Sequence, residues 1–176
     1  MPDERFSDDQ SLIEAIRRSD VSAFKDLYTR YYPLLGNYIF NRINSEEQTR
    51  DILQDIFTYL WENKQKLSIK TSLNAYLYRM AFNKTVNVYA KRAREKKYYL
   101  AQQIESGNSR DTDIEMKIDI QTVLNRLPEK VREVFVLSRY EGLMNAEIAG
   151  VLGVSIKTVE SRMTKALKKM REDLLT

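Results

Sequence analysis

Residues 145–171 read NAEIAGVLGVSIKTVESRMTKALKKMR, and their pattern indicates the class of the fold. Two helical patterns, residues 145–152 and 155–171, are separated by Gly153 and Val154, which is the tight junction of a helix-turn-helix. We expect Gly153 to make the turn with a positive φ, which glycine adopts without steric cost. The two helices are expected to pack through the apolar side chains of Ile148, Ala149, Leu152, Val159, Met163 and Leu167.

The second of these helices carries polar side chains that could read DNA. The segment from Ser155 to Arg171 contains six basic residues and one acidic residue, Glu160. Ser, Thr and Lys suit base edges or phosphates, and Glu suits the amino group of cytosine. The alternative is an ordinary helical hairpin with a solvated basic face, because such faces are common. The side chains left for DNA are Ile156, Lys157, Thr158, Glu160, Ser161, Thr164 and Lys165.

Helical patterns also fill the first half of the chain. Asp20 is a plausible N-cap, Pro33 is expected to kink or restart the helix that follows, and Ser45 with Gln48 forms a capping-box signature. The helix after Ser45 is amphipathic. One face holds Ile52, Leu53, Ile56, Phe57, Leu60 and Trp61, and the other displays Asp51, Gln54, Asp55, Thr58 and Glu62. Solvated carboxylates are the default interpretation of the second face, and a metal or acid-base site at Asp51 and Asp55 is disfavoured.

A basic segment follows this helix. Ser72 is expected to cap a long helix. Between Arg79 and Lys97 this helix contains seven basic residues and one acidic residue, Glu95. Such a helix could follow phosphates, and its aromatic residues could stack on unpaired bases. Packing in the core is an equally good interpretation for each tyrosine. The aromatic residues concerned are Tyr76, Tyr78, Phe82 and Tyr89.

Composition favours an all-α protein. The 176 residues include only 5 Gly and 3 Pro, too few for the turns of a sandwich or barrel. Cys and His are absent, so we expect no disulfide, no zinc site, no cofactor and no catalytic role. The N-terminus is acidic and no apolar stretch is long enough for a membrane span, which predicts a cytoplasmic protein without membrane insertion. The net charge of +4 suits a nucleic-acid partner because the basic residues are clustered.

The residues from Gln102 to Asp113 are polar and without periodicity. This pattern predicts a flexible linker between two small helical domains. We expect the first domain at residues 1–99, the linker at 100–115 and the C-terminal domain, with the helix-turn-helix, at 116–176.

Several segments together resemble the extracytoplasmic-function (ECF) group of the sigma-70 family of bacterial RNA polymerase initiation factors. Asp51-Ile-Leu-Gln-Asp-Ile-Phe57 is similar to the region 2 helix that binds polymerase, and Tyr76-Leu-Tyr-Arg-Met-Ala-Phe-Asn83 to the segment that opens the duplex. The family more often has Trp at the position of Tyr76. Leu127-Pro-Glu-Lys-Val-Arg-Glu-Val-Phe135, Glu141-Gly-Leu143, Glu147-Ile-Ala149 and Thr158-Val-Glu-Ser-Arg162 resemble region 4. The likeness covers nearly the whole chain.

The resemblance implies a factor that binds core RNA polymerase and directs promoter recognition, DNA melting and transcription initiation. The clamp of the largest polymerase subunit would be bound by Asp51, Gln54, Asp55 and Phe57. Region 4 would bind the flap of the polymerase. Unpaired minus-ten DNA would meet Lys66, Leu67, Ser72, Asn83, Lys84, Lys91 and Arg92. Duplex at the minus-thirty-five element would meet Arg139, Lys157, Thr158, Glu160, Ser161, Thr164 and Lys165. Glu160 departs from members that have Arg there. An anti-sigma factor is a further implied partner.

Two other functions are compatible with parts of the sequence. A repressor or activator that works without polymerase could use the same helix-turn-helix, with the N-terminal half binding a ligand or dimerising. The acidic face of the helix after Ser45 argues against that function. An enzyme acting on nucleic acid is disfavoured because the sequence has no convincing catalytic constellation.

Overall fold

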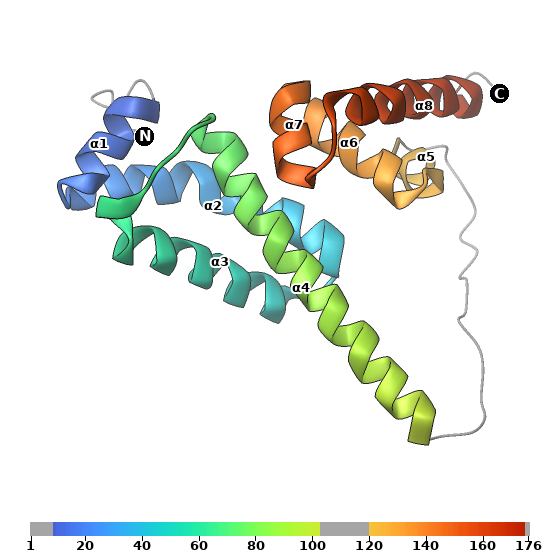
Figure 1. The fold of residues 1–176 in the computed structure, drawn as a ribbon, viewed down its shortest axis with the longest axis horizontal. Helices are drawn as coiled ribbons and strands as arrows, with labels where there is room; N and C mark the ends of the chain where they lie inside the picture. Colours follow the sequence, from blue (N-terminus) through green and yellow to red (C-terminus); the bar gives the residue numbers. More distant parts are fainter. Residues whose placement is uncertain (1–8, 103–119, 175–176) are drawn as a thin grey trace. The chain divides into compact units, whose positions relative to one another are not determined.

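The computed structural model describes residues 9–102 and 120–174, and within these ranges it contains helices and no strand (Figure 1). The predicted all-α class is confirmed. The first half has α1 (Asp9–Arg17), α2 (Val21–Ile43), α3 (Glu46–Glu62), the short 3-10 helix η1 (Lys64–Lys66) and α4 (Leu73–Gln102). The second half has α5 (Ile120–Arg126), α6 (Glu129–Arg139), α7 (Asn145–Leu152) and α8 (Ile156–Leu174).

α2, α3 and α4 begin directly after the capping residues that the sequence predicts. The Asp20 carboxylate accepts from the backbone N–H of Ser22 at 2.8 Å and of Ala23 at 3.2 Å. The Ser45 hydroxyl accepts from Gln48 N–H, and the Ser72 hydroxyl accepts from Ala75 N–H at 3.1 Å. Each cap satisfies a backbone donor that has no partner within its helix.

Pro33 does not divide α2. The helix runs through it from Val21 to Ile43, so of the two expected effects, a kink or a restart, the restart does not occur. Proline removes one helical hydrogen bond, and burial of a neighbouring apolar face can outweigh that loss. Leu27 before the proline and Leu35 and Ile39 after it are all buried, which holds both halves of α2 on the same core.

The core of the first half lies between α2, α3 and α4. α2 and α3 form an antiparallel hairpin (Figure 1). Its buried side chains include Leu35 and Ile39 from α2 and Ile56 and Leu60 from α3. α4 joins this hairpin through Tyr78, which is 1% exposed and meets the ring of Tyr38 edge to face with centroids 5.1 Å apart. Tyr78 is therefore a core residue.

Arg42 fastens α4 to the end of α2. Its Nε donates to the hydroxyl of Thr85, which is fully buried, at 3.0 Å. Its guanidinium lies over the Phe82 ring, 5.1 Å from the centroid. The Tyr89 hydroxyl donates to the Arg42 backbone carbonyl. These contacts set the orientation of α4 between Phe82 and Tyr89, the part of the helix that carries Asn83 and Lys84.

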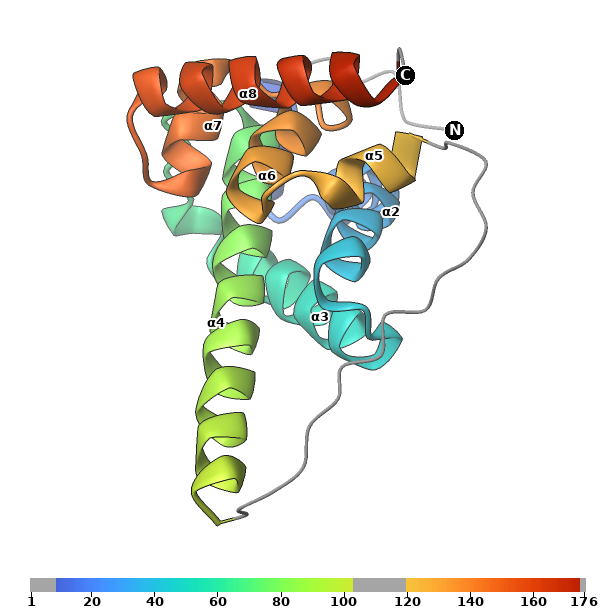
Figure 2. The same cartoon turned by 90° about the vertical axis from the view of Figure 1, so that its right-hand side faces the viewer.

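The second half is a separate helical unit. α8 packs along α5, α6 and α7 (Figure 2). A cluster of buried apolar side chains joins α5, α6 and α8, with Met163 packed against it. Its members are Val123, Leu124, Leu127, Val131, Phe135, Ala166 and Met170.

The helix-turn-helix is formed by α7 and α8. Gly153 ends α7 with φ 65°, in the left-handed region, as predicted, and its N–H donates to the Ala149 carbonyl. The expectation that Leu167 packs is wrong, because Leu167 is 41% exposed while Ala166 is fully buried. At 100° per residue, the position seven residues after Val159 lies closer to the buried stripe than the position eight residues after it.

The chain divides into two compact units, Met1–Lys91 and Arg92–Thr176, so the division falls inside α4. α4 extends to Gln102, past residue 99 where the sequence predicts the first domain to end. Residues 103–119, which hold most of the predicted linker, lie outside the described residues. No helix in the described ranges is long and apolar enough to span a bilayer.

Candidate polymerase and nucleic-acid interfaces

α3 displays a polar face on the side away from the core. Asp51, Gln54 and Asp55 are all exposed, whereas Ile52 and Ile56 are buried. The amphipathic pattern predicts this division, since residues three or four apart share a helix face. The carboxylate of Asp55 accepts from Lys84 Nζ of α4 at 2.8 Å. The polar face of α3 therefore adjoins the basic helix α4.

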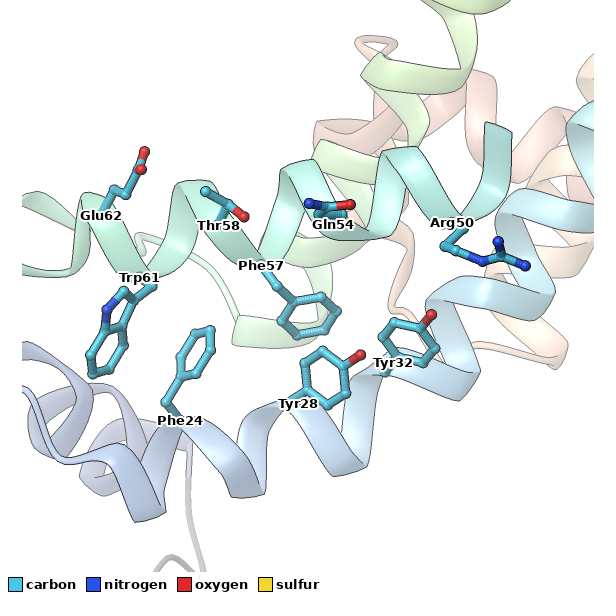
Figure 3. A pocket seen from close by; sticks show the side chains of 9 residues that line it. All are labelled: Phe24, Tyr28, Tyr32, Arg50, Gln54, Phe57, Thr58, Trp61 and Glu62. Atoms are coloured by element: carbon cyan, nitrogen blue, oxygen red, sulfur yellow. The ribbon is translucent and has the colours of Figure 1, made fainter. Parts of the chain in front are cut away.

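A groove of about 540 Å³ lies beside this face, between α2 and α3 (Figure 3). We call it the aromatic groove. Its apolar wall is built from Phe24, Tyr28 and Tyr32 of α2 and from Phe57 and Trp61 of α3. The rings meet closely, with centroids 4.7 Å apart for Tyr28 and Phe57 and 4.9 Å apart for Phe24 and Trp61. Arg50, Gln54, Thr58 and Glu62 of α3 complete the lining.

The aromatic groove brings together two of the four residues expected to bind polymerase. Gln54 and Phe57 line it, but Phe57 is only 4% exposed, so its ring supports the wall of the groove. Burial and the neighbouring Tyr32 raise the pKa of the Tyr28 hydroxyl above its ordinary value. Sequence reasoning missed the three α2 aromatic residues as part of a site. Their spacing of four residues could have shown that they form one row on a helix face.

The loop between α3 and α4 is anchored to the rest of the first unit. Leu67 is buried, and its carbonyl accepts from the Arg17 guanidinium of α1. Lys66 is exposed beside it. The Ser72 hydroxyl is occupied as the cap of α4. Of the loop residues expected to meet unpaired DNA, Lys66 thus presents its side chain, whereas Leu67 and Ser72 hold the loop in shape.

The residues of α4 that are expected to meet unpaired DNA differ in their exposure. Asn83 and Lys91 are exposed, and Lys84 and Arg92 are half-buried. Lys84 and Lys91 are seven residues apart and therefore share a helix face. This arrangement gives two cations along one row, next to Asn83.

The first turns of α8 present the polar residues expected to meet duplex DNA. Lys157, Glu160, Ser161, Thr164 and Lys165 are exposed and Thr158 is half-buried. The Ser155 hydroxyl accepts from Thr158 N–H at 3.2 Å and lies 2.8 Å from the Thr158 hydroxyl. Arg139, at the end of α6, is also exposed.

Known proteins share both units. The sigma-70 region 2 family model matches residues 27–95, and the sigma-70 region 4 family model matches residues 117–170. The ferric citrate uptake sigma factor FecI of Escherichia coli strain K12 is 30% identical over 151 residues, which cover 82% of this chain and 87% of FecI. The chain belongs to the sigma-70 family. It is a sigma factor of the ECF group, and such factors direct promoter recognition and transcription initiation.

Two further relatives resemble this sigma factor over most of its length. The ECF sigma factor SigW of Bacillus subtilis strain 168 is 24% identical over 180 residues, which cover 92% of this chain and 94% of SigW. The solved structure of CnrH in complex with the cytosolic domain of CnrY has a TM-score of 0.67 at 26% identity and covers 94% of this chain and 96% of that chain. Sigma factors are specificity subunits of RNA polymerase.

Proposed function

We propose that this sigma factor binds core RNA polymerase through the exposed face of α3 and the aromatic groove, and that α4 and α8 meet the two promoter elements. The observation that carries the proposal is the separation of charge between helices. α3 displays Asp51 and Asp55, whereas α4 displays Lys91 and Arg94 and the first turns of α8 display Lys157 and Lys165. Complementary charge favours a basic partner for α3 and nucleic acid for α4 and α8.

The polymerase contact has two parts in this proposal. Asp51, Gln54 and Asp55 are exposed and can form hydrogen bonds and ion pairs with the clamp of the largest subunit. The aromatic groove beside them offers Tyr28, 41% exposed, for an apolar contact. Phe57 supports that surface from beneath. Interfaces of this kind take much of their affinity from aromatic anchors and use charged rims for orientation.

The minus-ten contact would be made with unpaired DNA. Lys66, Asn83, Lys84, Lys91 and Arg92 supply cationic and amide groups along the loop and α4, while Leu67 and Ser72 fix the loop. An unpaired base held against this surface would not be available to pair again, which would lower the cost of keeping the duplex open. Recognition and melting would then be one event, and no bond is made or broken by the sigma factor itself.

The minus-thirty-five contact would be made with duplex DNA. The first turns of a recognition helix contact base edges in the major groove, and nearby basic residues contact phosphates. α8 supplies Lys157, Thr158, Glu160, Ser161, Thr164 and Lys165, and α6 supplies Arg139. In addition, region 4 would meet the polymerase flap.

We also propose an anti-sigma partner and a cytoplasmic location. CnrH, whose fold resembles this chain, was solved in complex with the cytosolic domain of CnrY. A protein that covers the face of α3 would keep this sigma factor from polymerase. Transcription takes place in the cytoplasm of bacteria, where this sigma factor would meet its polymerase.

The experiment is to mix the purified protein with core RNA polymerase, separate the complex by size and test it for transcription from genomic fragments. The native chain should co-elute and produce discrete start sites. The variant Asp51→Lys with Asp55→Lys should keep its helix content and lose co-elution, because both side chains are exposed on α3. Co-elution that persists would refute the assigned interface.

A matched control carries the same change of net charge elsewhere. Glu14→Lys with Glu172→Lys alters exposed residues of α1 and α8 and should co-elute like the native chain. If the native chain itself shows no association with a cognate core enzyme, the stand-alone regulator with the same helix-turn-helix replaces this proposal.

A further inference from the structure

Glu160 is the only acidic residue of α8 before Glu172, and it stands in the part of the helix that carries the DNA-facing residues. Its neighbours on the exposed side are Lys157, Ser161 and Thr164. Among the residues that the structure describes, none forms an ion pair or hydrogen bond with its carboxylate. Within these residues, the acceptor oxygens of the carboxylate are therefore left for a further partner.

A carboxylate in the major groove is selective because it can only accept hydrogen bonds. Guanine presents N7 and O6 there and thymine presents O4, which are all acceptors and repel it. Only the amino groups of cytosine and adenine donate in this groove. On adenine, the acceptor N7 lies beside the amino group, whereas the major-groove edge of cytosine carries no acceptor. Cytosine is therefore the base that fits a single carboxylate.

Thr164, one turn after Glu160, has the same bias. Its hydroxyl donates to the Glu160 backbone carbonyl at 3.0 Å, so the lone pairs of its oxygen face outward as acceptors. Side chains at i and i+4 lie one above the other on a helix face. This face of α8 thus offers hydrogen-bond acceptors on two successive helical turns, at Glu160 and Thr164. Lys157 and Lys165 supply the attraction to phosphates.

We infer that Glu160 is a specificity-determining residue that accepts a hydrogen bond from the amino group of a cytosine in the upstream promoter element. The inference rests on the proposed function, in which α8 enters the major groove. Glu160 favours cytosine and also disfavours the other bases. Opposite any other base, its carboxylate would lose its water and face only hydrogen-bond acceptors and phosphates. The residue thus lowers affinity for wrong sequences at a cost in overall DNA affinity.

The test is a selection of upstream duplexes, randomised in sequence, by the holoenzyme assembled from the full chain and core polymerase. The native holoenzyme should select cytosine at one position, with other bases bound on the order of 10-fold more weakly. Glu160→Ala should lose the preference at that position alone and bind random duplex more tightly. Glu160→Gln should shift the preference to adenine, and Glu160→Arg should shift it to guanine.

The control is Lys169→Ala, which removes an exposed charge from the same helix, where Lys169 pairs with Asp173 at 2.8 Å. It should change the preference at no position. A native preference for guanine or thymine at the position that responds to Glu160, or identical preferences in all three Glu160 variants, overturns the inference. Selection of no upstream sequence by a native holoenzyme that still initiates transcription overturns the proposed role of α8 and the role of Glu160 with it.

Discussion

Lys84 Nζ lies 2.8 Å from Asp55 Oδ2, so an ion pair joins the basic helix α4 to the polar face of α3. The Lys84 side chain is 33% exposed and the Asp55 side chain 64% exposed. Solvent and salt screen a pair in this position, and such pairs contribute roughly 0 to 1 kcal/mol to stability. In the proposed function each residue has a partner elsewhere, polymerase for Asp55 and DNA for Lys84, so both can exchange this weak contact for another.

A double-mutant cycle tests the weakness of this ion pair. Lys84→Ala, Asp55→Ala and the double variant should give a coupling free energy below about 1 kcal/mol in urea unfolding, and added salt should reduce it. Lys84→Ala should weaken binding of the holoenzyme to unpaired promoter DNA while leaving co-elution with core polymerase intact. A coupling of several kcal/mol would show that the pair is a structural element of the first unit.

Phe57 should matter to folding before it matters to binding. Its ring is 4% exposed and packs on Tyr28 and Phe24, so Phe57→Ala should lower the free energy of unfolding by about 3 to 5 kcal/mol. Thr58→Ala, at an exposed position that also lines the aromatic groove, should change it by less than about 0.5 kcal/mol. Equal unfolding midpoints for the two variants in urea would contradict the burial of Phe57.

Much of this fold is predictable from hydrophobic periodicity. The pattern after Ser45 identifies which residues of α3 are buried and which are exposed, because a 3.6-residue repeat leaves few alternatives. The left-handed Gly153 is likewise predictable, since only glycine adopts that turn without strain. Periodicity does not decide which of two adjacent apolar residues is buried when both lie near the apolar face of a helix, as Ala166 and Leu167 do.

The aromatic groove could not be predicted in the same way. It depends on which rings of α2 meet which rings of α3, and sequence spacing within one helix does not determine the pairing between two helices. Leu67 shows a related limit. It lies in a polar, basic segment that suggests solvent exposure, yet the tertiary contact of its carbonyl with Arg17 draws it into the first unit, where its side chain is buried.

Gly150 within α7 and Gly153 directly after it should respond oppositely to replacement by alanine. Gly153 has φ 65° and no atom lies within 4 Å of an added Cβ, so Gly153→Ala adds backbone strain alone and should cost about 1 to 2 kcal/mol. Gly150 has the same open space but lies within the helix, so Gly150→Ala should stabilise by up to about 1 kcal/mol. Thermal unfolding checks the pair, and a shift of the same sign in both variants would contradict the assigned conformation of Gly153.

Tyr31 should make stability depend on alkaline pH. Burial, and then the Asp9 carboxylate, raise the pKa of its hydroxyl from 10.0 to about 12, with Arg30 opposing. The folded state therefore holds the proton of the Tyr31 hydroxyl more tightly than the unfolded chain does. The contribution of this proton to the free energy of unfolding is fully present below pH 10.0 and is lost as the pH rises toward about 12. Urea unfolding across this range should show a smaller loss for Tyr31→Phe than for the native chain. A Tyr31→Phe curve that matches the curve of the native chain would rule out this linkage.

Lys165 should contribute affinity without sequence selectivity. It is exposed one turn beyond Ser161, and a lysine that contacts phosphate releases one counterion when DNA binds. Lys165→Ala should therefore reduce the slope of log affinity against log salt by about 1, and weaken every upstream sequence by a similar factor. Holoenzyme binding to several duplexes over a range of salt measures both quantities. A loss confined to one base pair would instead make Lys165 a base contact, and it would then share with Glu160 the task of reading the upstream element.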